Sequence, residues 1–134
     1  MVEVELSRIM ITQTSDHQVI WLREKGGKRS FPILIGIFEA LAIHRKIKEE
    51  DTIRPMTHDL LANVIAALHF RLSRVIVTSL RENTFFAKLV LGSNGTEVEI
   101  DSRPSDAIAL AVRLEAPIFV AEEVLQEVAK DEGA

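Results

Sequence analysis

The sequence predicts an α+β fold in which antiparallel strands predominate and helices pack on the sheet. Segments of alternating apolar and polar residues occur in hairpin-like pairs, and β-branched and aromatic residues are concentrated in them. Apolar helical segments separate these strand groups, so the expected order of elements is βββ-α-α-βββ-α-β-α. The 134 residues are enough for one hydrophobic core, and we expect a single domain over residues 1–134.

The first three expected elements are strands. Residues 2–13 alternate apolar and polar side chains, which is typical of a half-buried strand. Residues 17–24 and 29–35 form the next pair, joined by a Lys-Gly-Gly-Lys turn in which the glycines can adopt positive φ. Pro32 lies in the third strand and predicts a sheet edge or an irregularity, because proline donates no ladder hydrogen bond.

Helices and strands then follow in groups. Gly36 is expected to open a helix over 37–50, and a second helix is expected over 57–72 after Pro55. The remaining expected elements are strands at 74–83, 84–91 and 96–101, a helix at 104–116, a short strand at 117–122 that could be parallel, and a final helix at 122–133.

Composition excludes several functional classes. No apolar run reaches the roughly 18 residues of a membrane helix, and the absence of cysteine excludes disulfides, thiolate catalysis and zinc–thiolate sites. The N-terminus lacks the layout of a signal peptide, so a cytoplasmic location is expected. No H-E-x-x-H, P-loop or G-x-S-x-G motif is present.

The charge distribution does not favour a dedicated nucleic-acid-binding protein. Residues 1–91 hold 13 Lys and Arg against 10 Asp and Glu, whereas residues 92–134 hold 3 against 10. Nucleic-acid binding by counterion release requires clustered cations, and stacking on single strands requires aromatic residues. The chain has one Trp and no Tyr, so it supplies few aromatic residues for stacking. An enzyme that binds nucleic acid only weakly is still compatible with this composition.

Two helix entrances share one pattern, an Arg-Pro pair followed by a hydroxyl residue and an aspartate, at residues 54–59 and 103–106. Helix capping explains part of this pattern. Thr57 is a natural N-cap, and Asp59 and Asp106 are expected in first turns, where the helix dipole favours a carboxylate.

Capping does not explain the two arginines. Arg54 and Arg103 each precede a proline, which disfavours the α region and keeps them extended. An arginine at a helix entrance is placed to contact a phosphate or carboxylate held at the helix N-terminus. The alternative for Arg103 is a surface ion pair with Asp101, which contributes little stability.

Three further side chains are candidates for chemistry. Asp101 and Asp106 flank one turn, and both could reach a hard cation such as Mg²⁺ or Mn²⁺. Glu39 is either part of a solvated stripe with Lys46 or an inward carboxylate of raised pKa that acts as a ligand or general base. His58 lies at a helix start and could act as a general acid or electrophile.

Three segments carry a family resemblance: I-G-I-F-E-A-L-A-I at 35–43, R-P-M-T-H-D-L-L at 54–61 and D-S-R-P-S-D-A-I-A-L-A-V-R at 101–113. In this order and spacing they resemble the bifunctional nuclease domain family, whose bacterial and archaeal members were formerly catalogued as a domain of unknown function. The resemblance covers nearly the whole chain. It implies a single α+β domain that self-associates, and plant relatives with additional segments imply a nuclease acting on RNA and DNA.

The positions that match the family's recurring residues include most of the side chains singled out above. They are Glu39, Arg54, Pro55, Thr57, His58, Asp59, Asp101, Ser102, Arg103, Pro104, Ser105 and Asp106.

The leading hypothesis is a nuclease that hydrolyses phosphodiester bonds of RNA, DNA or both, assisted by Mg²⁺ or Mn²⁺ and without an organic cofactor. The expected metal ligands are carboxylates, namely Asp101, Asp106, Glu39 and Asp59. The expected substrate-binding residues are Arg54, Arg103, Thr57 and Ser105. The expected catalytic residues are Asp101, Asp106, His58, Arg103, Arg54 and Glu39, with His58 transferring a proton.

Two alternatives stay open at this point. The same arginines and helix N-termini could form a non-enzymatic module that binds an anionic ligand or a protein partner. The cluster of Arg and Asp side chains could also be a structural ion-pair network. In each case a homodimer or another homo-oligomer is expected, without a membrane partner.

Overall fold

The structure is a computed structural model that describes residues 1–12 and 14–131. It confirms the predicted α+β class. In chain order the elements are β1 (Val2–Met10), β2 (Gln18–Glu24), β3 (Arg29–Ile35), α1 (Ile37–Ile47), α2 (Thr57–Ala67), β4 (Arg71–Arg81), β5 (Thr84–Ser93), β6 (Thr96–Ser102), α3 (Pro104–Leu114), β7 (Ile118–Val120), α4 (Glu122–Val128) and β8 (Lys130–Asp131).

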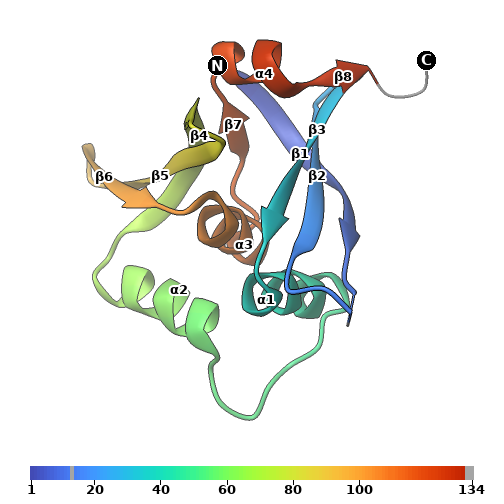
Figure 1. Ribbon diagram of the computed structural model, residues 1–134. Coiled ribbons are helices and arrows are strands. Elements are labelled where there is room, and N and C mark those ends of the chain that lie inside the picture. Colours follow the sequence, from blue (N-terminus) through green and yellow to red (C-terminus); the bar gives the residue numbers. More distant parts are fainter. Residues whose placement is uncertain (13, 132–134) are drawn as a thin grey trace.

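The strands of the described residues form one eight-stranded sheet in the order β6-β5-β4-β7-β1-β2-β3-β8. Neighbouring strands are antiparallel except β4 and β7, which are parallel, so the parallel strand expected near residue 117 is confirmed. In Figure 1 the sheet bends around α3, with β4–β6 on one side of the helix and β1–β3 on the other. Helices α1 and α2 lie beside α3 away from β7, and α4 lies at the opposite end near β8.

Helix α3 is the centre of the core. It contacts α1, α2, β4 and β5, and the run from Ala107 to Ala111 is buried. Small alanines beside Ile108 and Leu110 let the sheet and two helices approach it from different sides. This packing brings the N-terminus of α3 close to α1 and α2, where the candidate site forms.

The predicted edge position of Pro32 is also confirmed. Strand β8 pairs with β3 only at Arg29 and Ser30, so it ends before it reaches Pro32. On its other side Pro32 lies opposite Trp21 of β2. The missing N–H of the proline therefore costs the sheet no hydrogen bond on the β8 side.

Several predicted helices are too long. Helix α1 ends at Ile47 and not at residue 50, and α2 ends at Ala67 and not at residue 72, because His69 takes a positive φ of 64° and turns the chain into β4. The last helix ends at Val128 and is followed by β8, an element that the sequence did not predict. Residues 132–133 of that predicted helix lie outside the described residues. Among the residues that the structure describes, no helix has the length and apolar character to cross a membrane.

The end of α3 gives a stability prediction. Glu115 follows the helix with φ at 57°, and the next residue, Ala116, donates its N–H to Ala111. A left-handed C-cap favours glycine, which has no Cβ to clash there. We expect Glu115→Gly to raise the free energy of unfolding by about 0.5–1 kcal/mol in urea denaturation. Glu115→Ala is the control and should give no gain, because it keeps the Cβ; equal gains in both would contradict the backbone explanation.

Candidate functional site

Three helices carry a carboxylate at their third residue, where the helix dipole favours negative charge. These residues are Glu39 in α1, Asp59 in α2 and Asp106 in α3. Because α1 and α2 both pack on α3, the three helix starts belong to one region of the molecule. Their carboxylates nevertheless have different partners.

Glu39 and Asp59 cap their own helices. Glu39 Oε2 accepts a hydrogen bond of 2.8 Å from the backbone N–H of Gly36, and Asp59 Oδ2 accepts one of 3.0 Å from that of Met56. The prediction that Thr57 is the N-cap is therefore wrong. Met56 is the N-cap and Thr57 is the first helical residue, because the Asp59 carboxylate performs the capping.

Asp106 differs because its oxygens face side chains. Oδ1 lies 3.0 Å from His58 Nε2, and Oδ2 accepts from Arg103 Nη2 at 2.8 Å and Nε at 3.0 Å. We assign the shared proton to His58 Nε2, since the carboxylate oxygen accepts; Nδ1 of a neutral imidazole then carries the free lone pair. The two helix entrances, 48 residues apart, thus meet through the contact between His58 and Asp106.

Arg103 extends this contact to the third helix. Its Nη2 also lies 3.5 Å from Glu39 Oε1. Glu39 is buried, with 6% of its surface exposed, so the expected alternative of a solvated stripe with Lys46 is wrong. The alternative ion pair between Arg103 and Asp101 is also wrong, because Arg103 is bound by Asp106 and Glu39. The hydrogen bond to Asp106, together with its negative charge, raises the pKa of the Arg103 guanidinium, which remains charged.

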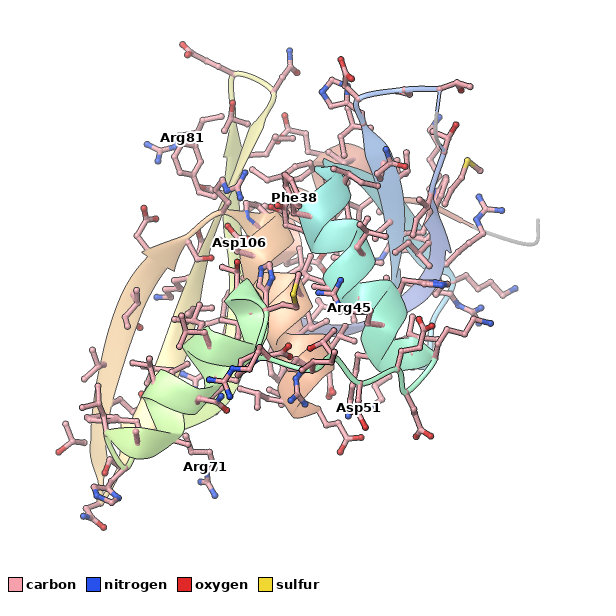
Figure 2. All side chains as sticks on the ribbon, turned by 90° about the horizontal axis from the view of Figure 1, so that it is seen from below. Phe38, Arg45, Asp51, Arg71, Arg81 and Asp106 are labelled. Atoms are coloured by element: carbon pink, nitrogen blue, oxygen red, sulfur yellow. The ribbon has the colours of Figure 1, made fainter. Side chains whose placement is uncertain are left out.

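These polar groups lie at one end of a cleft of about 790 Å³ between α1, α2, α3, β5 and β6. Figure 2 shows Phe38 and Arg45 on α1 and Asp106 at the start of α3, with α2 alongside. The rest of the lining is largely apolar. Its apolar side chains are Phe38, Leu41, Met56, Leu61, Ile65, Leu89, Leu91, Ile100 and Leu110.

The structure brings together most of the predicted site residues. Of the predicted catalytic, substrate-binding and metal residues, those that line the cleft are Glu39, Thr57, His58, Asp101, Arg103 and Asp106. Arg54 is exposed and does not line it, and Asp59 lines a separate polar hollow of about 680 Å³. Ser105 is buried and lines another hollow, beside β3. Arg54, Asp59 and Ser105 therefore do not share the cleft with Asp106.

Sequence reasoning named Glu39 of α1 but missed the other α1 side chains that line this cleft. Phe38, Leu41 and Arg45 all line it and follow one another at spacings of three and four residues. This spacing places them on one helix face, so helical periodicity could have found them. Arg45 also lines the polar hollow, as does His58. The two hollows therefore adjoin at these two residues.

The carboxylates do not form a closed metal cage. Within the described ranges, no group of three or more His, Asp or Glu side chains is placed to hold a metal ion. Both oxygens of Asp106 have protein partners, whereas Asp101 is exposed and its neighbour across the strands, Lys88, pairs with Glu99. Mg²⁺ is commonly bound by one or two carboxylates together with substrate phosphates and water. Asp106 Oδ1 has His58 as its protein partner and keeps one further lone pair, and the exposed Asp101 lines the same cleft.

Asp59 gives a pH prediction of its own. Burial raises the pKa of Asp59, but the hydrogen bonds from Met56 and Arg113 together lower it by more. The pKa of Asp59 is therefore below its ordinary value. A carboxyl whose pKa is lowered in the folded state stabilises the fold above its unfolded pKa, and this stability is lost as pH falls through the folded value. Asp59→Asn should cost about 1 kcal/mol in urea unfolding at neutral pH, and the difference from wild type should begin to shrink below about pH 4 and vanish only once the pH is below the lowered folded pKa.

The matched control for Asp59→Asn is Asp51→Asn, which changes an exposed loop carboxylate. Its stability should equal that of wild type at both pH values. A loss for Asp59→Asn that persists unchanged at low pH would contradict a role for the ionised carboxylate.

The fold and the cleft define a small α+β domain with a carboxylate–histidine pair and an arginine at one end of an open site. The sequence model of the bifunctional nuclease domain matches residues 20–132 of the chain. The chain belongs to the bifunctional nuclease domain family. Strand β1 precedes the matched region but is part of the same sheet, since it pairs with β2 and β7.

Individual relatives agree with this membership. The uncharacterized protein Rv1829 of Mycobacterium tuberculosis is 40% identical over 125 residues, which cover 93% of this chain and 74% of the relative. Bifunctional nuclease 2 of Arabidopsis thaliana is 29% identical over 108 residues, and Bifunctional nuclease 2 of rice, Oryza sativa subsp. japonica, is 26% identical over 114. These alignments cover 78% and 82% of this chain, but only 33% and 35% of the plant proteins.

Proposed function

We propose that this domain is a nuclease that hydrolyses phosphodiester bonds of RNA, DNA or both at the polar end of the cleft. The observation that carries the proposal is the 3.0 Å contact between His58 and Asp106, made beside Arg103. A histidine oriented by a carboxylate is a suitable acid–base group, and an arginine is a suitable phosphate ligand. Family membership and the names of the plant relatives add support for a nucleic-acid substrate.

In the proposed reaction a water oxygen attacks the phosphorus, and the bond from phosphorus to the leaving oxygen breaks. His58 Nδ1 takes the proton of the attacking water, while Asp106 holds the imidazole by Nε2; a water molecule on the opposite side protonates the leaving oxygen, and His58 releases its proton to solvent. Arg103 is 68% exposed along its side chain, so it can offer N–H groups to the phosphate oxygens while it remains bound to Asp106. Thr57 lines the cleft and could donate its hydroxyl to the same phosphate.

We further propose that a divalent cation, Mg²⁺ or Mn²⁺, assists this reaction. Asp101 and Asp106 would hold it, with the substrate phosphate completing the coordination. Such a cation neutralises developing charge and lowers the pKa of bound water. No organic cofactor enters the proposal.

The test is cleavage of end-labelled RNA and DNA by highly purified protein with Mg²⁺, Mn²⁺ or EDTA. Asp101→Asn is compared with Glu97→Gln, which changes a carboxylate on the same strand that pairs with Arg74. We expect cleavage to saturate with the cation and Asp101→Asn alone to need about tenfold more of it. Cleavage that EDTA leaves unchanged would contradict the cation. No cleavage under any condition would contradict the nuclease and favour the anion- or protein-binding module.

We also propose that the domain forms a homodimer or another homo-oligomer. Leu60, Val64 and Leu68 follow one face of α2 and remain 57%, 44% and 64% exposed. An apolar stripe of this kind is typical of a surface that another chain covers. Light scattering tests this: Val64→Glu should reduce the mass to that of a monomer, and a wild-type mass equal to one chain would contradict it.

The cytoplasm is the proposed compartment, on composition alone.

A further inference from the structure

The apolar part of the cleft is not needed for the acid–base chemistry. Several of its side chains stay accessible to solvent, including Phe38 at 78%, Met56 at 46% and Ile100 at 42% exposure. These side chains come from three separate segments of the chain and line one hollow. Exposed apolar side chains that gather in a concave site are a feature of ligand binding.

The apolar wall and the polar end belong to the same hollow. Phe38 is adjacent in sequence to Glu39, and Met56 lies two residues before His58, so these two apolar residues lie beside polar ones. Arg103 and Arg45 contribute positive charge to the lining from different elements. The matching ligand therefore carries a planar, weakly polar group joined to an anionic one. A nucleotide with an unpaired base has this chemistry.

We infer that the cleft receives an unpaired base of a single-stranded nucleic acid, with the adjoining phosphate at Arg103 and the base against Phe38. This inference rests on the proposed nuclease function and names its substrate class. A volume of about 790 Å³ lies within the range of sites for small ligands of up to drug size.

The cleft is expected to bind single strands in preference to duplexes, because a base that is paired and stacked cannot enter it. In a duplex the faces of the bases are covered by their stacked neighbours, and most protein contacts are made to phosphate and sugar. A base can enter an apolar cleft only where it is unstacked, as in single strands, loops and ends. Stacking on an aromatic side chain is tolerant of sequence, because every base has a π face. The cleft therefore selects for strandedness and not for sequence.

The experiment measures binding separately from cleavage. The full chain carrying His58→Gln, with Mg²⁺ present, is titrated against three labelled oligonucleotides of equal length: a single strand, its duplex and an abasic strand. We expect the single strand to bind about tenfold more tightly than the other two, and Phe38→Ala to remove that difference. The matched control is Ile47→Ala, a half-exposed apolar residue of the same helix outside the cleft, which should change nothing.

Several outcomes would overturn the inference. One is equal binding of all three oligonucleotides; another is single-strand binding that Phe38→Ala does not weaken. A free mononucleotide that competes as well as the strand would replace the strand with a free nucleotide as the ligand. If Phe38→Ala converts an oligomer to a monomer by light scattering without weakening strand binding, a second copy of the chain covers this surface.

Parallel cleavage assays on wild type separate this inference from the proposed function. Cleavage of single strand and duplex at equal rates would overturn the base-binding cleft while leaving the nuclease intact. Base-dependent binding without any cleavage would support the cleft as a single-strand site and contradict the nuclease.

Discussion

Asp106→Asn is expected to lower the cleavage rate by roughly 10²–10⁴-fold while the protein remains folded. The asparagine amide has one acceptor oxygen and no charge, so it cannot accept from both His58 and Arg103 as the carboxylate does. The imidazole then loses the partner that fixes its tautomer and orientation. Single-turnover cleavage of a labelled RNA or DNA strand measures the effect, with the far-UV spectrum and the melting temperature as checks of folding.

Asp59→Asn is the matched control, because Asp59 holds the same third position in its own helix. It should keep full cleavage activity and lose stability, since its carboxylate caps α2 and binds Arg113. The opposite result, with Asp106→Asn fully active and Asp59→Asn inactive, would move the chemistry to the polar hollow that Asp59 lines.

His58→Gln is expected to lower kcat by roughly 10²–10³-fold, with a smaller effect on KM. Glutamine can still donate a hydrogen bond to Asp106 but cannot exchange a proton near neutral pH. The variant should therefore also lose one limb of the pH dependence of kcat. His69→Asn is the control, because His69 is exposed beyond the end of α2 and asparagine tolerates its positive φ.

A His58→Gln variant with a uniformly reduced rate and an unchanged pH profile would contradict a proton-transfer role. Because His58 is 8% exposed, its replacement also tests packing, and the melting temperature is needed beside the kinetics. A large loss of both stability and activity would favour the structural reading of the cluster, in which Arg103 ties α3 to α1.

The fold could be predicted in outline because its signals are local. Alternation in β1, the turn before Arg29 and the proline at the start of α3 each act within a few residues. The ends of α1 and α2 could not be predicted, because the chain leaves these helices through non-glycine residues of positive φ, Glu49 and His69. Strand β8 has two residues and exists only through its pairing with β3, so it carries no local signal.

The candidate site could be predicted only in part, because the doubled Arg-Pro pattern has different registers at the two entrances. Arg103 is itself the N-cap of α3, so its side chain reaches Asp106 three residues later. Arg54 lies two residues before the N-cap of α2, Met56, and its side chain is exposed. Two additional residues in the first copy, Met56 between proline and hydroxyl and His58 between hydroxyl and aspartate, thus separate a surface arginine from a site arginine.

The contact between His58 and Asp106 could not be predicted from spacing at all. The two residues lie on different helices, and packing of α2 on α3 brings them together. Sequence reasoning named both as candidates because each lies at a helix start, but it assigned them to separate tasks. The tertiary structure makes them a single unit.

The most direct test of this unit is a double-mutant cycle on single-turnover cleavage with Asp106→Asn, His58→Gln and the double variant, all confirmed as folded. Because Asp106 acts mainly by orienting His58, the double variant should lose far less activity than the product of the two single losses. If the two losses multiply in the double variant, the residues act independently, and the proposed carboxylate–histidine unit is wrong.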